Sequence, residues 1–216
     1  MVGKAACLAN DVIFGWSASA DEDKKQATDL VNRALSRGAA DVRAHSVKGS
    51  ILLFGQPADA LAAYNLALEI NPNFHTAHAG RAVALILSGR AREAVSPLEL
   101  ALRISPRDPA ASLWLWELRV AHLHLRQYEE AIEQCSRSVN MNGANFKAYI
   151  SLISAYGSTG QMEKARQALA QLDKTHPNFT LQLYRRVAYA FSSDPEYRRG
   201  VDNILDGLRK GGIPEQ

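Results

Sequence analysis

The chain of 216 residues is poor in the features that mark several common classes of protein. Its two cysteines, Cys7 and Cys135, form no CxxC pair, which excludes a disulfide framework and leads us to expect a reducing, cytoplasmic setting. Its apolar runs stay below the about 18 residues of a membrane-spanning helix, and Asn10 and Asp11 interrupt the apolar start of a signal peptide. The net charge of +3 is too small an excess to indicate nucleic acid or a membrane surface as a partner.

What the sequence does have is an internal repeat. Pro72 and Pro106 are 34 residues apart, as are one pair of glycines and two pairs of alanines around them. The repeated units span residues 41–74, 75–108, 112–145 and 146–179, with three additional residues before the third unit. A period of this length indicates a solenoid of small supersecondary units, and the abundance of alanine and leucine indicates that these units are helical.

The units resemble the tetratricopeptide repeat, a helix–turn–helix unit of 34 residues. The matching residues of the first two units are Ala60, Tyr64, Ala67 and Pro72, then Ala94, Leu98, Ala101 and Pro106. In this pattern small residues let paired helices approach closely, a glycine ends the first helix and a proline stops the second. The resemblance implies an all-α fold, a right-handed α-solenoid of antiparallel helix pairs. Lys48 and Arg119 depart from it, because repeat position 8 usually holds a small residue.

The two ends of the chain deviate from the repeat. We expect a degenerate repeat over residues 1–40 and two capping helices over residues 180–216, in a single solenoid that covers 1–216. The last helix carries one apolar stripe, formed by Tyr197, Val201, Ile204, Leu205 and Leu208. A helix with one polar face is suited to cap the open end of a solenoid. The sequence thus predicts about twelve helices and no strands, with a bend at Pro97 inside the helix of residues 91–104.

In the tetratricopeptide family, partners usually bind the concave face formed by the first helices, at repeat positions 2, 5, 9 and 12. The resemblance therefore implies a groove lined by His45, Leu52, Ala79, Val83, Ile86, Leu113, Trp116, Val120, Leu123, Lys147 and Ile150, with Ser154 and Gly157 at the same positions of the fourth unit. Only Lys147 fits the family's carboxylate clamp, which disfavours a chaperone tail as the ligand. An apolar groove suits an amphipathic helix. Alternatively, curvature closes the groove or the chain's own flanking helix fills it.

Trp116 has two interpretations. At repeat position 5 it faces the groove with Val120 and Leu123, and an exposed tryptophan with apolar neighbours often marks an interaction site. The alternative is that the three additional residues rotate this helix, so that Trp116 is buried and Trp114 lies outside.

Motifs of catalysis and cofactor binding are absent. The sequence has no GxxxxGK[ST] loop, no GxGxxG, no HExxH and no GxSxG. His75 and His78 share a helix face, but no cysteine or carboxylate is placed to complete a metal site, so we expect both near solvent at a helix start. His122 and Cys135 occupy core positions of the repeat and are interpreted as core residues. We predict no enzyme, no catalytic residue, no metal and no cofactor.

A narrower resemblance concerns residues 204–214, ILDGLRKGGIP. This stretch is similar to the ending of bacterial proteins in which a tetratricopeptide region follows a class III adenylate/guanylate cyclase domain or a winged-helix DNA-binding domain. The resemblance implies that the chain is the C-terminal interaction region of such a protein, and it implies no activity, because no cyclase residues are present.

The sequence favours a non-enzymatic, cytoplasmic protein–protein interaction scaffold that binds a polypeptide segment in an apolar groove. The partner is expected to be a protein or peptide, with an amphipathic helix as the favoured form and self-association left open, and not nucleic acid or membrane. The alternative is a regulatory or sensor region that binds a small ligand or peptide and controls an attached cyclase or DNA-binding domain.

Overall fold

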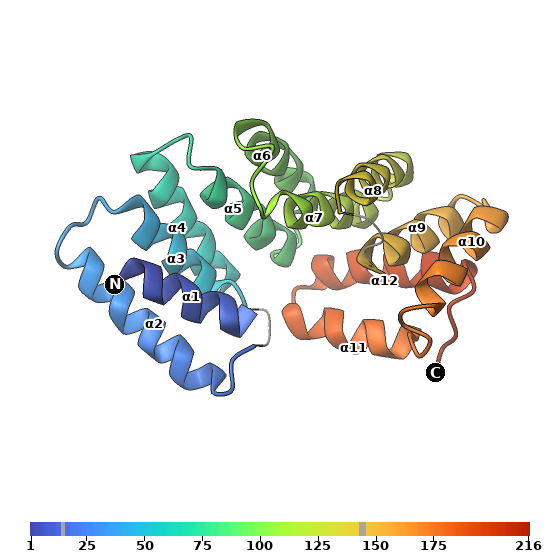
Figure 1. The fold of residues 1–216 in the computed structure, drawn as a ribbon, viewed down its shortest axis with the longest axis horizontal. Coiled ribbons are helices and arrows are strands. Elements are labelled where there is room, and N and C mark those ends of the chain that lie inside the picture. The colour runs from blue at the N-terminus through green and yellow to red at the C-terminus, as the bar shows by residue number, and fades with distance from the viewer. Residues whose placement is uncertain (14–15, 143–145) are drawn as a thin grey trace. The chain divides into compact units, whose positions relative to one another are not determined.

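The structure is a computed structural model that describes residues 1–13, 16–142 and 146–216 of the chain, without the side chains of residues 136–142. These residues form twelve α-helices and no strand, as the repeat pattern predicts (Figure 1). The chain divides into two compact units, Met1–Leu85 and Ile86–Gln216. No helix in the described ranges is both long and apolar enough to cross a membrane.

The first unit begins with a helix pair that packs on the helix after it. Its helices are α1 (Val2–Ile13), α2 (Ala20–Leu35), α3 (Val42–Leu52), α4 (Pro57–Ile70) and most of α5 (His75–Leu87). α1 contacts both α2 and α3, and small side chains such as Ala5 and Ala27 fill the space between them. The degenerate first repeat is therefore a helix pair, and residues 14 and 15, which follow its first helix, lie outside the described residues.

Tyr64 of α4 packs closely against two neighbouring helices of this unit. A Cβ atom added to Gly49 of α3 or Gly80 of α5 would overlap its ring, so both positions require glycine. The Tyr64 hydroxyl lies 3.1 Å from Ser50 Oγ, and burial raises the pKa of Tyr64 to about 12. Lys48 is exposed at repeat position 8. Gly49, one residue later, supplies the small residue that the pattern needs there.

The second unit begins with the end of α5 and contains the remaining helices. Its helices are α6 (Ala91–Ile104), α7 (Ala111–His124), α8 (Tyr128–Asn142), α9 (Phe146–Ser158), α10 (Met162–Asp173), α11 (Leu181–Phe191) and α12 (Pro195–Lys210). Repeat position 20, where paired helices are expected to touch, holds a buried alanine in all four clear repeats, in this unit Ala94, Ala131 and Ala165 and in the first unit Ala60. Pro97 lies inside α6, which runs from Ala91 to Ile104 without a break.

The glycines that end the first helices have the backbone conformation that the repeat requires. Gly55, Gly89 and Gly160 have φ values of 102°, 71° and 74°, in the left-handed region that glycine adopts at no steric cost. The third repeat places Arg126 at this position, with a φ of 59°. Arg126 is the one non-glycine residue of the described chain with a positive φ.

Candidate functional site

The candidate site of the second unit is the surface of α7 and α9 against which α12 packs. α12 packs against α9 and α7, the first helices of their repeats (Figure 1). The apolar stripe recognised in the sequence faces them, and all five of its residues are at most 5% exposed. In this unit, the chain's own flanking helix therefore covers part of the surface where the sequence predicts a groove.

Contact between α12 and α9 brings backbone against backbone. A Cβ atom added to Gly157 of α9 would overlap the carbonyl oxygen of Gly207, and one added to Gly207 would overlap the carbonyl oxygen of Ser154. Gly211 is equally tight against Ile153. The Ser154 hydroxyl donates a hydrogen bond of 3.0 Å to the Ile204 carbonyl oxygen. Ser154 and Gly157 are the two positions of the predicted groove that hold α12 on α9.

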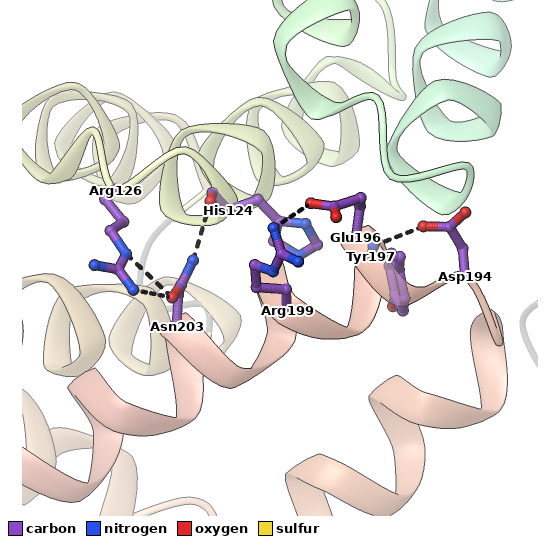
Figure 2. Close-up of polar contacts among 7 residues, drawn as sticks. All are labelled: His124, Arg126, Asp194, Glu196, Tyr197, Arg199 and Asn203. Atoms are coloured by element: carbon purple, nitrogen blue, oxygen red, sulfur yellow. Dashed lines mark hydrogen bonds and ion pairs between the residues drawn. The ribbon is translucent and has the colours of Figure 1, made fainter.

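Arg126 connects the end of α7 with α12. Its Nε and Nη2 atoms donate to Asn203 Oδ1 at 3.1 and 2.7 Å (Figure 2). The Asn203 amide in turn donates to the carbonyl oxygen of His124 at 3.3 Å. We call these three residues the Arg126 latch. Because an L-amino acid in the left-handed region is strained, the contact that Arg126 makes there points to a role for this side chain.

The His124 ring lies under the first half of α12. Its centroid is 5.4 Å from that of Tyr197, and a Cβ atom on Gly200 would overlap it (Figure 2). Burial lowers the pKa of His124 to about 4. Tyr197 donates from its hydroxyl to the Ala188 carbonyl oxygen at 3.1 Å, so this part of α12 is also tied to α11.

The start of α12 is capped and anchored. Asp194 accepts a hydrogen bond of 2.9 Å from the backbone N–H of Tyr197, which satisfies one of the free donors of the first turn (Figure 2). Ser192 donates from its hydroxyl to the Leu87 carbonyl oxygen at 2.6 Å. Gly89, just after the end of the helix that contains Leu87, lies against the Asp194 carboxylate. The α11–α12 hairpin is thus fixed at its turn as well as along α12.

A charged cluster lies between α7 and α9. The Lys147 ammonium sits 4.1 Å from the centroid of the Trp116 ring, a cation–π contact. Burial raises the pKa of Glu117 to about 7, against the opposing effect of Lys147 and Arg119. Burial also lowers the pKa of Lys147. Trp114 is only 5% exposed, whereas Trp116 is partly exposed, so the structure buries Trp114 and leaves Trp116 accessible beside Lys147.

The other predicted groove residues differ in accessibility. Leu113 and Val120 of α7 are partly exposed, and Leu123 and Ile150 are buried. Ile86, just inside the second unit, is buried too. In the first unit Leu52 and Val83 are partly exposed, Ala79 is buried, and His45 donates from Nε2 to the Ala39 carbonyl oxygen at 2.8 Å. Buried members of the set support the fold, so the accessible ones are the candidates for binding.

Two expectations about polar residues need correction or completion. His78 is buried rather than near solvent, and its Nε2 donates to the Pro72 carbonyl oxygen at 2.7 Å. Arg119, at repeat position 8, is fully buried, and its guanidinium has no hydrogen-bond partner among the residues that the structure describes.

Cys135 and His122 are core residues as predicted. Burial raises the pKa of Cys135 to about 12, which keeps the thiol protonated and unreactive. Among the described residues no three histidines, cysteines or carboxylates gather as a metal site would require.

Sequence reasoning missed the Arg126 latch and the backbone contact between α9 and α12. The signal for the latch was an arginine at repeat position 15, where the other repeats have glycine. The signal for the contact was a helix with Gly200, Gly207 and Gly211 beside its apolar stripe. Neither signal predicts which helix Arg126 or the glycines of α12 would contact.

Comparison with known proteins supports the same architecture. The sequence matches no protein-family model. Among solved structures, the chain is similar to PilW, a type IV pilus biogenesis factor, with a TM-score of 0.70, 18% identity and 96% of each chain covered. It is also similar to YrrB, a TPR protein with an unusual peptide-binding site, with a TM-score of 0.60, 20% identity, and 84% of this chain and 90% of YrrB covered. It is similar as well to TTC0263, a TPR protein of Thermus thermophilus, with a TM-score of 0.59, 20% identity, and 85% of this chain and 98% of TTC0263 covered.

Proposed function

We propose that this chain, which has the tetratricopeptide-repeat fold, is a protein-interaction scaffold that binds an amphipathic helical segment on the first helices of its repeats. The observation that carries the proposal is the position of α12. The faces of α7 and α9 hold an amphipathic helix through apolar contacts, close backbone approach and a few polar bonds. Helix-in-groove recognition uses the same elements between proteins. The peptide-binding site of YrrB supports the same class of function.

The residues proposed to meet the partner are the accessible members of the predicted groove. Trp116 and Val120 follow each other by one turn on α7, and Lys147 faces Trp116 from α9. A partly exposed tryptophan beside a cation is typical of the residues that anchor interfaces. In the first unit, the corresponding accessible residues are Leu52 and Val83. The role proposed for all of them is recognition, without a chemical step.

Site-specific photo-crosslinking in the native cells tests this function. A photoreactive phenylalanine analogue is placed at Val120 or Val83 on the first helices, and at Glu133, an exposed residue of α8, as the matched control. We expect adducts from Val120 or Val83 that contain a helical segment of one protein, and none from Glu133. Adducts of equal yield from all three positions, or from Glu133 alone, would contradict the proposal.

A further inference from the structure

The α11–α12 hairpin, residues 181–215, is held together by contacts of its own. Tyr197 binds the Ala188 carbonyl oxygen, and the Tyr189 hydroxyl donates to Asp202 at 2.7 Å. The backbone N–H of Leu181 donates to the Pro214 carbonyl oxygen at 2.9 Å, so the end of the hairpin is closed as well. Its contacts with the inner helices come mainly from α12. Leaving α7 and α9 would break the contacts of α12 with them and the Ser192–Leu87 hydrogen bond, and it would keep the contacts inside the hairpin.

The sequence of α12 by itself only weakly favours a helix. Gly200 and Gly207 lie inside α12, and glycine is among the poorest helix formers, so α12 relies on packing against neighbouring helices, α11 included, for its structure. The backbone of Arg126 is strained because it occupies the left-handed region, and this strain partly offsets the stabilisation that the latch provides. The latch also lies at the surface, where water competes for its hydrogen bonds.

We propose that α12 is a displaceable occupant of the α7–α9 face and that the partner is an amphipathic helix with the same pattern. This inference rests on the proposed function and names its partner class. The pattern has large apolar residues at relative positions 0, 4, 7 and 11, as Tyr197, Val201, Ile204 and Leu208 do. It has glycine at positions 3, 10 and 14, where the ring of His124, the Ser154 carbonyl oxygen and the backbone of Ile153 leave no room for a Cβ atom.

Steric selection distinguishes this site from a general apolar surface. A partner helix with alanine at the position of Gly207 would place its Cβ atom against the Ser154 carbonyl oxygen, which is backbone and cannot move aside. An ordinary amphipathic helix with leucine or alanine there is excluded. The partner is thus recognised by where it is small as well as by where it is apolar.

Hydrogen exchange of the full chain tests whether α12 opens by itself. We expect the amides of α12 to exchange through an opening that leaves α7 and α9 protected, since α12 is held by fewer elements than they are. Equal protection of α12, α7 and α9 at every denaturant concentration would show that α12 opens only when the unit unfolds. That result would overturn the proposal.

Binding of a labelled synthetic peptide of residues 195–213 tests the partner class. Arg126→Gly removes the latch while keeping a residue that favours the left-handed backbone, and Gly38→Ala is the control, because a Cβ atom there meets nothing within 4 Å. We expect Arg126→Gly to lower the apparent Kd for the peptide by about tenfold through a larger open fraction, and Gly38→Ala to leave it unchanged. A peptide with Gly207→Ala should not bind.

Three results of the peptide experiment would also overturn the proposal. The first is no peptide binding to the full chain or to Arg126→Gly. The second is equal binding of the Gly207→Ala peptide. The third is a doubled molar mass of Arg126→Gly in light scattering, which assigns the face to a second copy of the chain. Peptide binding without adducts at Val120 or Val83 would contradict the proposed function and support only the displacement of α12, whereas adducts without peptide binding would overturn this inference alone.

Discussion

Small residues and their exceptions explain much of this molecule. The alanines expected at the helix contacts are buried, and three of the four clear repeats turn at a glycine with positive φ. Arg126 is the exception, and its side chain binds Asn203 of α12. Lys48 is another departure from the pattern, and the adjacent Gly49 takes over the small-residue contact with Tyr64.

Overpacking at a helix contact tests the residue register. Ala94 of α6 is fully buried, so Ala94→Leu should lower the free energy of unfolding by about 1–3 kcal/mol. Ala170→Leu on α10 is the matched control, because Ala170 is exposed and should tolerate the same change. Urea denaturation measures both variants. Equal midpoints for Ala94→Leu and the natural chain would show that the assigned contact is wrong.

The two tryptophans of α7 should respond differently to truncation. Trp114→Ala removes a core side chain and should cost about 3–5 kcal/mol of stability. Trp116→Ala removes a partly exposed one, so stability should change much less while partner binding weakens by about 2 kcal/mol. Thermal unfolding and titration with the crosslinked partner segment measure the two effects. A large loss of stability in Trp116→Ala with normal binding would refute its assignment to the binding face.

At the scale of elements, α12 determines which part of the repeat surface stays accessible in the second unit. Its apolar stripe is directed at α9 and α7, so it covers the binding face that the resemblance implies. Two residues of α7 near this contact have pKa values shifted in opposite directions. They are His124, which packs against α12, and Glu117, which lies between α7 and α9.

Acidification should loosen the α12 contact through His124. Burial lowers the pKa of this histidine from 6.5 to about 4, so the unfolded chain binds the proton more readily than the folded one. Its contribution is therefore fully present above pH 6.5 and is lost as pH falls toward 4, by at most about 3 kcal/mol. Denaturation of the natural chain and of His124→Gln at both ends of this range isolates the effect, because Gln does not titrate.

Glu117 makes that comparison necessary. Its pKa is raised to about 7, so its contribution is present below pH 4.5 and is lost as pH rises toward 7, opposite in sign to that of His124. The difference between the natural chain and His124→Gln removes the Glu117 effect, which both proteins share. An identical pH dependence of the two proteins would contradict the burial of His124 under α12.

Sequence reasoning predicted the helices and their pairing more fully than their long-range contacts. Repeated alanines and glycines fix which helices pair, because those contacts recur at each period. The stripe on α12 shows that Tyr197 and Ile204 are buried, but a stripe does not specify the helix that buries them. The approach of Gly207 to Gly157 depends on both backbones at once, and two glycines 50 residues apart carry no shared period.

Of the twelve helices of the described residues, the four clear repeats account for eight, the degenerate repeat for two and the α11–α12 hairpin for the last two. Along the chain, the division between the two compact units falls between Leu85 and Ile86, inside α5, and not at a boundary between repeats. The similarity to PilW, YrrB and TTC0263 shows the same fold at 18–20% identity. A single solenoid over residues 1–216 remains a prediction from the period.

In this structure α12 packs against α9 and α7 and does not form a further layer beyond α10. Nuclear Overhauser contacts between the α-protons of Gly157 and those of Gly207 or Gly211 test it most directly, because only this packing brings the two backbones so close. Strong contacts between these glycines are expected in the full chain at neutral pH. Their absence, together with contacts between α12 and α10, would contradict it.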